Sequence, residues 1–318
     1  MPEHSSLDIA VVIPTFNRRD LLERTLDSVF AQTVPPAEVI VVDDGSDDGT
    51  TELLERLPIT EVVRNPDGGW GPARGRNEGL DRVKSPLVAF LDSDDLLLPR
   101  ALELLGSALV ADPRPTFAFG ICLLAAEVDG AWRMEGEMGP EPADLLDPLR
   151  SLYARNFVPS VGTVVRTSAA FAVGGFPRVT QFAEDHYFWL LLARDADPIF
   201  VPELTGVHRS HPGNRHTPAK AEDELEAFLA LAVEDKRLEA AVPDRLGVGL
   251  AESLGPAVRS GDIGATVRAL RTNLLSRPDK AAILRRAGHH MRSRRHREAQ
   301  SRARHSDDEQ LTAWLADH

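Results

Sequence analysis

The sequence predicts an α/β protein built on a mostly parallel sheet with flanking helices, followed by a helical C-terminal region. Short apolar, β-branched runs alternate with helical patterns early in the chain, which is the order of a parallel sheet covered by helices on both faces. The apolar runs are almost uninterrupted, as expected for strands that are buried on both sides. Polar clusters follow three of these runs, at the strand ends where such sheets bind their ligands.

The strands and helices of this alternating region can be followed in order along the chain. Strands are predicted at Ile9–Ile13, Val39–Val42, Glu61–Val63 and Leu87–Leu91, and helices at Arg19–Ala31, Thr50–Arg56, Ala73–Val83 and Pro99–Val110. Each strand prediction follows from an apolar run, and each helix prediction from apolar residues that recur three or four positions apart. Pro99 suits the first turn of its helix, because that position needs no backbone N–H donor.

The pattern becomes looser after residue 115. Antiparallel strands are predicted at Thr116–Glu127 and Trp132–Glu135, a further strand at Val161–Arg166 and a helix at Asp185–Arg194. Beyond Pro218 the pattern is helical, with helices predicted at Ala219–Ala241, Leu246–Arg259, Ile263–Leu275 and Glu309–Ala316. We therefore divide the chain into an α/β domain over residues 1–218 and a helical extension over residues 219–318.

The composition is that of a globular protein. The chain has 318 residues, of which 42% are hydrophobic and 27% charged, and its formal net charge is −13. An acidic body disfavours binding to nucleic-acid backbones, which needs a basic surface. The single cysteine, Cys122, cannot form an internal disulfide and lies in an apolar run. We therefore expect an unreactive core thiol in a reducing compartment.

Neither a signal sequence nor a membrane span is predicted, which favours a cytoplasmic location. The stretch from Arg277 to His305 is nevertheless basic, with ten Lys and Arg against two acidic residues and a net charge of +8. The simplest interpretation is a solvated helix or tail. A second interpretation is peripheral contact with an anionic membrane or an acidic partner, since each basic residue near such a membrane contributes about 1 kcal/mol.

Two carboxylate clusters, Asp43–Asp48 and Asp92–Asp95, each end a predicted buried strand. Either cluster alone could be a solvated turn or a helix cap, because Asp, Gly and Ser favour both. Together they should meet at the ligand edge of one sheet, where neighbouring carboxylates need a cation or hydrogen-bond donors. Oxygen ligands of this kind suit Mg²⁺ or Mn²⁺, which commonly join carboxylates to substrate phosphates.

Six motifs occur in order between about Ile9 and Arg215. They are Val12–Arg18, Val41–Thr50, Ala73–Gly79, Phe90–Asp95, the turn Gly174-Gly175-Phe176, and Glu184-Asp185 ahead of an apolar helix. The ordered set resembles family 2 glycosyltransferases, which are inverting enzymes of the GT-A fold. The resemblance implies transfer of a sugar from a nucleotide diphosphate, most often UDP, to an acceptor hydroxyl with the help of a divalent metal.

The resemblance also implies roles for individual residues. Asp44 would accept a hydrogen bond from the base, and Arg76 would reach the nucleotide. The full set of implied nucleotide-sugar contacts is Pro14, Thr15, Phe16, Arg18, Asp44, Arg74, Arg76, Asp92 and Ser93. Metal ligation is implied for Asp94, Asp92 and His211, and general-base catalysis for Asp185 with Glu184 beside it. Gly75 stands where the family often has Ala, which makes Arg74 a second candidate for the role of Arg76.

Several of these residues also have simpler explanations. Acidic residues such as Glu184 and Asp185 complement the dipole at a helix start, and the dipole would keep the pKa of Asp185 low. Loop histidines are commonly just solvated, and this applies to His208, His211 and His216. Trp70, in its Gly-rich loop, is either ordinary packing or a platform on which a sugar ring stacks.

The chemistry is coherent on the residues alone, because a metal clamp would stabilise a departing diphosphate and one carboxylate would activate the acceptor. Two other functions stay open. A sugar-nucleotidyltransferase would carry a basic, Gly-rich loop after the first strand, where this chain has Pro14-Thr15-Phe16. A catalytically silent nucleotide-sugar-binding or scaffold protein would not need both the Asp92 and Asp94 pair and Asp185.

Overall fold

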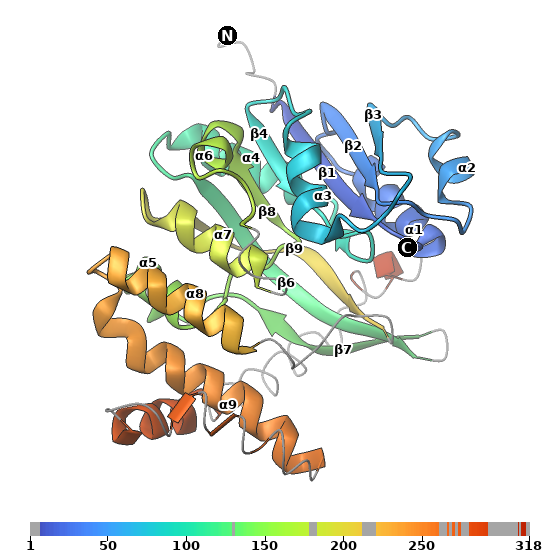
Figure 1. The fold of residues 1–318 in the computed structure, drawn as a ribbon. Coiled ribbons are helices and arrows are strands. Elements are labelled where there is room, and N and C mark those ends of the chain that lie inside the picture. Colours follow the sequence, from blue (N-terminus) through green and yellow to red (C-terminus); the bar gives the residue numbers. More distant parts are fainter. Residues whose placement is uncertain are drawn as a thin grey trace.

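The described part of the chain forms one mixed sheet with helices on both faces (Figure 1). The structure is a computed structural model that describes residues 7–128, 131–177, 183–211, 221–260, 266, 269–270, 273–274, 280–291, 311 and 313–315. Its strand order is β3-β2-β1-β4-β8-β6-β9-β5, and β7 pairs with β6 outside this path.

The strands are β1 (Ile9–Thr15), β2 (Glu38–Asp43), β3 (Glu61–Arg64), β4 (Leu87–Phe90), β5 (Leu96–Leu97), β6 (Phe117–Val128), β7 (Ala131–Met138), β8 (Thr163–Arg166) and β9 (Ile199–Ser210). The helices are α1 (Arg19–Phe30), α2 (Thr50–Leu54), α3 (Gly71–Leu80), α4 (Ala101–Ala111), α5 (Pro148–Ala154), α6 (Thr167–Ala172), α7 (Glu184–Ala193), α8 (Ala221–Glu234) and α9 (Val242–Ser260), with single 3₁₀ turns at η1 (Asp144–Leu146) and η3 (Glu239–Ala241).

Strands β1 to β4 confirm the predicted parallel half of the sheet. β1 lies between β2 and β4 and is parallel to both, and β3 continues the sheet beyond β2. Because side chains alternate along a strand, Ile9 and Val11 join the core under α1, α2 and α4, whereas Ala10 and Val12 join the core under α3 and α7. Both faces are therefore covered, which explains the uninterrupted apolar runs.

The second half of the sheet is not parallel throughout. β8 is antiparallel to β4 and to β6, and β6 forms the predicted antiparallel pair with β7. β9, which the sequence analysis did not predict, runs parallel to β6 along most of its length. Pro202 and Glu203 interrupt the apolar pattern of β9, so its pairing with β6 and β5, and not a local pattern, identifies it as a strand.

The helices after residue 218 continue the core of the α/β domain. Phe228 and Leu231 of α8 belong to the same buried cluster as Phe90 of β4 and Trp189 of α7. In Figure 1, α7, α8 and α9 follow one another away from the sheet. The predicted division at residue 218 falls within 212–220, outside the described residues, and stays a prediction.

Only residues 280–291 of the predicted basic stretch are described, and they are helical with Ile283 and Ala287 buried against Leu246 and Leu250 of α9. The helices predicted at Ile263–Leu275 and Glu309–Ala316 fall largely outside the described residues. Within the described ranges, no helix has both the length and the apolar character needed to cross a bilayer. Cys122 is buried, and burial raises the pKa of its thiol, as expected for an unreactive core thiol.

Candidate active site

The polar ends of the parallel strands meet at one edge of the sheet, as predicted. Thr15 at the end of β1 lies beside Asp43 at the end of β2, and the Asp44 N–H donates to the Thr15 carbonyl over 3.0 Å. The two loops that follow are joined through Asn17, whose N–H donates to Ser46 Oγ and whose Oδ1 accepts from the Asp47 N–H, both at 2.9 Å. Asn17 has a positive φ of 50°, a conformation that Asn tolerates better than most residues.

The side chains of Pro14, Thr15 and Phe16 border this edge. Phe16 is 43% exposed, whereas Thr15 is buried and its Oγ1 has no hydrogen-bond partner among the described residues. Pro14 packs against α3, where a Cβ added to Gly75 would lie only 3.1 Å from the Pro14 Cβ. Gly75 therefore allows a close approach of α3 to β1.

Asp44 organises the Gly-rich loop that precedes α3. Its carboxylate accepts from Asn65 Nδ2 at 2.6 Å, from the Trp70 N–H at 3.0 Å and from the Gly71 N–H at 2.9 Å. Gly71 has a positive φ of 72°, which a side chain would disfavour. The Asp44 carboxylate thus stabilises the loop before α3, a structural role that the resemblance did not imply.

Trp70 and Arg74 pair with each other in this loop and the first turns of α3. The Arg74 guanidinium lies 4.8 Å from the centre of the Trp70 ring, and Arg74 Nε lies 3.2 Å from Glu78 Oε1. Neither side chain is fully buried. The Trp70 ring is held by Arg74 at the surface and is not part of the core.

The DXD sequence Asp92-Ser93-Asp94, together with Asp95, places three carboxylates around one point after β4. One oxygen of each carboxylate lies within 4.8 Å of the others. The Asp94 carboxylate contacts Arg18 and, at 2.9 Å, His211 Nε2. All three are predicted site residues, so the structure brings them together. Burial alone would raise the pKa of Asp94, but Arg18 and His211 outweigh it and lower the pKa. His216 lies outside the described residues.

Asp95, which sequence analysis did not assign to the site, is a structural anchor. Its carboxylate accepts from the Arg209 N–H at 3.1 Å and lies 3.0 Å from His208 Nδ1. The charge of Asp95 raises the pKa of His208 to about 9, so His208 is protonated at neutral pH. Through His208 and Arg209, Asp95 connects the end of β9 to the acidic cluster.

Arg209 makes a second connection from β9. It is 3% exposed, and its guanidinium donates to the Asp94 carbonyl, to the Leu21 carbonyl at 2.9 Å and to Thr25 Oγ1 at 3.0 Å. Burial lowers the pKa of Arg209 to about 10. Arg209 was not among the predicted site residues, and no local sequence pattern indicated this role.

Arg76 is a buried bridge between the acidic cluster and α7. It is 4% exposed and donates to Asp92 Oδ1 at 2.5 Å and to Glu184 Oε1 at 3.0 Å. Burial disfavours its charge, but the carboxylates of Asp92 and Glu184 raise its pKa above the usual range. The implied contact of Arg76 with a nucleotide stays a prediction, and its observed partners are these two carboxylates.

The Gly174-Gly175-Phe176 turn is held by Asn77, the residue after Arg76. Asn77 Nδ2 donates to the Phe176 carbonyl at 2.9 Å, and the Phe176 N–H donates to Asn77 Oδ1 at 2.8 Å. Gly174 and Gly175 have positive φ angles of 80° and 74°. The turn places Phe176 under the Arg76 guanidinium, 5.1 Å from the ring centre.

Asp185 opens α7 next to Glu184, but its carboxylate has a different set of partners. Oδ2 accepts from Ser160 Oγ at 3.1 Å and from Asn156 Nδ2 at 3.4 Å, and Oδ1 accepts from the His186 N–H at 2.6 Å. Burial, followed by the charge of Glu184, raises the pKa of Asp185 to about 6. The expectation of a low pKa from the helix dipole was wrong, because desolvation outweighs a dipole contribution of about 1 kcal/mol.

The acidic cluster fits a hard divalent cation. Asp92 and Asp94 offer carboxylate oxygens close together at the sheet edge, with His211 beside Asp94. Such donors suit Mg²⁺ or Mn²⁺. Asp95 offers a third carboxylate oxygen, and this carboxylate also contacts His208 and the Arg209 N–H.

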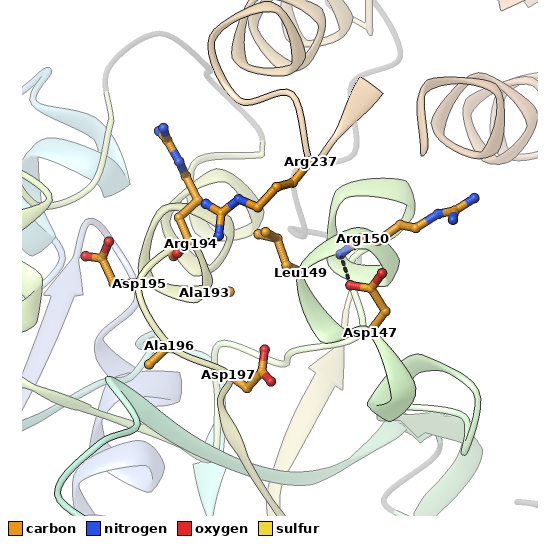
Figure 2. Close-up of a pocket in the computed structure, with 9 residues that line it drawn as sticks. All are labelled: Asp147, Leu149, Arg150, Ala193, Arg194, Asp195, Ala196, Asp197 and Arg237. Carbon is orange, nitrogen blue, oxygen red and sulfur yellow. Dashed lines mark hydrogen bonds between the residues drawn. The ribbon is translucent and has the colours of Figure 1, made fainter. Parts of the chain in front are cut away.

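A cavity of about 450 Å³ lies at the opposite end of α7 from Asp185 (Figure 2). Its lining carries both charges and includes Arg150, Arg194 and Arg237 together with Asp147, Asp195 and Asp197. Arg194 and Arg237 both pair with Asp235, and Arg150 lies 3.4 Å from Asp244. The cavity contains none of the predicted site residues.

A mostly parallel sheet with flanking helices, whose strand ends gather acidic residues at one edge, is the arrangement of the GT-A fold. The sequence pattern of "Glycosyl transferase family 2" matches residues 10–169, half of the chain. The chain belongs to glycosyl transferase family 2.

Relatives with assigned functions match parts of the chain. A GalNAc(5)-diNAcBac-PP-undecaprenol beta-1,3-glucosyltransferase of Campylobacter jejuni is 36% identical over 123 residues, which are 37% of this chain and 39% of that protein. Glycosyltransferase AglE of Haloferax volcanii is 27% identical over 215 residues, covering 64% of this chain and 67% of AglE. The match thus spans about two-fifths of the first relative and two-thirds of the second.

Solved structures share the fold over most of the chain. TarS 1-349 of S. aureus in complex with UDP-GlcNAc superposes with a TM-score of 0.59 and 20% identity, covering 84% of this chain and 81% of that chain. The mannosyltransferase PcManGT from Pyrobaculum calidifontis, in complex with GDP-Man and Mn²⁺, gives a TM-score of 0.50 and 21% identity over 83% of this chain and 78% of that chain. At these identities the likeness establishes the fold alone.

Proposed function

We propose that this protein transfers a sugar from a nucleotide-diphosphate donor to an acceptor hydroxyl, with inversion at the anomeric carbon and with a divalent metal. The observation that carries this proposal is the bridge through Arg76. It joins Asp92 of the acidic cluster at 2.5 Å to Glu184 at 3.0 Å, and Glu184 directly precedes Asp185. A site for the leaving diphosphate and a carboxylate base are thereby held in a fixed relationship.

Asp185 is the proposed general base. Its pKa of about 6 leaves the carboxylate ionised at neutral pH and more basic than an ordinary aspartate. As the acceptor oxygen bonds to the anomeric carbon, the hydroxyl proton passes to Asp185 and the bond to the diphosphate oxygen breaks, with its electron pair leaving on the diphosphate. A single displacement of this kind inverts the anomeric carbon.

Asp92 and Asp94, with His211, are the residues that would hold the metal. When bound there, a divalent ion would supply Lewis-acid stabilisation to the departing diphosphate. Arg18 lies beside Asp94 and adds a positive charge at the same place. This charge matters because a chain with a net charge of −13 would otherwise repel an anionic donor.

UDP is the proposed donor nucleotide, in line with the family resemblance and with the UDP-GlcNAc complex of the structural neighbour TarS. The GDP-Man complex of PcManGT makes guanosine nucleotides the natural comparison in any test. Contact of the basic stretch 277–305 with an anionic membrane is a separate proposal, which salt-dependent sedimentation with anionic vesicles would test.

The proposed function can be tested without knowing the acceptor, because water can take the place of the acceptor hydroxyl in a slow hydrolysis of the donor. We would measure nucleotide release from a panel of UDP- and GDP-sugars with Mn²⁺, and the anomer of the released sugar by NMR. Asp185→Asn should lower the rate about 10²- to 10⁴-fold. Asp197→Asn is the matched control, since Asp197 is exposed in the distant cavity.

A wild-type rate for Asp185→Asn would overturn the assignment of the base. Release of the sugar with its original anomeric configuration would overturn single displacement. A protein that binds a nucleotide sugar tightly but never releases the nucleotide would instead be the silent binding protein considered above.

A further inference from the structure

We propose that Asn156 and Ser160 are positioning residues for the general base, acting together on one oxygen of Asp185. This inference rests on the proposed function, because it takes Asp185 as the base. Neither residue belongs to a motif that sequence analysis identified. Both lie in the segment between α5 and β8, 29 and 25 positions before Asp185.

The two donors converge on the same atom. Ser160 Oγ lies 3.1 Å and Asn156 Nδ2 lies 3.4 Å from Asp185 Oδ2, while the His186 N–H occupies Oδ1 at 2.6 Å. The carboxylate is therefore held from both sides, and its plane is fixed relative to α7. A fixed plane matters for proton transfer, because the accepting lone pair must face the acceptor hydroxyl.

The orientation of the Asn156 amide is set by its own loop. Asn156 Oδ1 accepts from the Val158 N–H at 3.1 Å, which leaves the NH₂ group to face Asp185. This NH₂ group can only donate, so it favours the ionised form of the base. The Ser160 hydroxyl both donates and accepts, so it can remain bonded to Asp185 before and after the proton arrives.

The loop that carries the two donors is anchored on both sides. Phe157 and Val158 are completely buried, and Val161 is 2% exposed. Gly162 follows with a φ of 78°, and its carbonyl accepts from the Gly120 N–H at 3.1 Å. A side chain at Gly162 would collide with Thr205, so the backbone beyond Ser160 has little freedom to move.

The surroundings explain why such donors are needed. Glu184 from α7 and Asp92 from the end of β4 both disfavour the charge of Asp185, and Arg76 from α3 only partly offsets them. The buried His186 ring faces the Leu152 carbonyl at 2.5 Å and not the carboxylate. Within the part of the chain that the structure describes, Asn156 and Ser160 are thus the side chains that donate hydrogen bonds to the Asp185 carboxylate.

The test compares Ser160→Ala and Asn156→Ala with wild type in the donor-hydrolysis assay across pH 5 to 9. Each variant should lower kcat about 10-fold, with the KM for the donor unchanged, because a hydrogen bond to a charged group is lost. The acid limb of the pH profile should move to higher pH by about half a unit to one unit, since the ionised base is less stabilised. Ser160→Thr, which keeps the hydroxyl, should restore the wild-type profile.

Ser85→Ala is the matched control. The Ser85 hydroxyl also donates to a carboxylate, that of Glu38, but Ser85 lies two residues before β4, at the amino end of the strand, whereas Asp92 and Asp94 follow its carboxyl end. This variant should leave both kcat and the acid limb unchanged.

Asp185→Asn in the same assay distinguishes failure of the proposed function from failure of the positioning role alone. If it is fully active, the proposed function fails and the positioning role fails with it. If it is inactive while Ser160→Ala and Asn156→Ala keep the wild-type kcat and acid limb, only the positioning role is overturned. A loss of kcat with an unmoved acid limb and a lower melting temperature would also overturn it, because that pattern marks a purely structural role.

Discussion

Glu184 and Asp185 are adjacent at the start of α7, yet their carboxylates face different sets of partners. Glu184 Oε1 accepts from Arg76 at 3.0 Å, and Asp185 Oδ2 accepts from Ser160 at 3.1 Å. Successive side chains on a helix differ by about 100° in direction, which separates the two. Glu184 therefore contacts the Arg76 bridge to the acidic cluster, whereas Asp185 contacts the loop before β8.

Glu184→Gln should weaken the Arg76 bridge without removing it, because the amide oxygen can still accept from Arg76. We expect the free energy of unfolding to fall by about 1–3 kcal/mol, since a buried guanidinium loses one of two charged partners. Chemical denaturation measures this change. Glu78→Gln is the control, because its partner Arg74 is 43% exposed and such pairs contribute about 0–1 kcal/mol. Equal losses for the two variants would contradict the bridging role.

Asp185→Asn should stabilise the fold while it lowers activity about 10²- to 10⁴-fold. The pKa of Asp185 rises from an ordinary 3.8 to about 6 on folding, so the folded state favours the protonated acid. Ionisation therefore costs stability as pH rises from about 4 to 6, and the cost, about 1–3 kcal/mol, is constant above that range. Urea denaturation should show the variant to be more stable at pH 8, with the gap closing at pH 4. A less stable variant at pH 8 would contradict the burial of this charge.

The activity of the wild type should follow the same ionisation. Because the base must be unprotonated, kcat/KM should fall about tenfold per pH unit below an apparent pKa of about 6. Rates of donor hydrolysis between pH 4.5 and 8 measure this limb. A limb near pH 4 would show that Asp185 keeps an ordinary pKa or is not the base.

Asp94→Asn should remove the dependence of nucleotide binding on metal. We expect Mn²⁺ to strengthen UDP binding to the wild type and EDTA to stop turnover, while the variant loses about 100-fold in metal affinity. Calorimetric titration of UDP with and without Mn²⁺ measures the difference. Asp20→Asn, at a carboxylate that is 90% exposed, should behave as the wild type. Full turnover of the wild type in EDTA would contradict a metal site.

Arg209→Met should weaken the attachment of the acidic cluster to α1 and β9. The carbonyls of Asp94 and Leu21 would lose their donor in a buried setting, which should cost about 2–4 kcal/mol of unfolding free energy. Denaturation curves measure this, and Mn²⁺-dependent UDP binding should weaken as well. Arg133→Met, at a side chain 64% exposed, is the control and should change stability by about 0–1 kcal/mol. A fully stable Arg209→Met variant would contradict the role of Arg209 as a link between β9 and α1.

The parallel half of the sheet could be predicted from the sequence because its determinants are local. The run Ile9–Ile13 is apolar at every position, and β1 is buried on both faces. The position of Asp92 at the ligand edge then followed from topology, because it comes directly after a strand parallel to β1. Asp94, Arg18 and His211 lie together at this edge, and the roles implied for them stay predictions.

The rest of the site depends on contacts between distant parts of the chain. Asp95 and Arg209 are 114 positions apart and meet only because β9 pairs with β6 and β5. The pKa of Asp185 depends on its burial, which its immediate neighbours in sequence do not reveal. Asn156 and Ser160 lie in a loop without a recognisable pattern, so only the three-dimensional arrangement brings them to Asp185.

The packing of α8 against α7 limits how this chain can be divided. The Phe228 carbonyl accepts from the Tyr153 hydroxyl at 3.1 Å, and the Phe228 ring lies 4.7 Å from that of His186, the residue next to Asp185. A fragment that stopped at residue 218 would expose these aromatic surfaces and leave the Tyr153 hydroxyl without that acceptor. Expressed apart, residues 1–218 would therefore lack the aromatic packing that α8 supplies beneath α7.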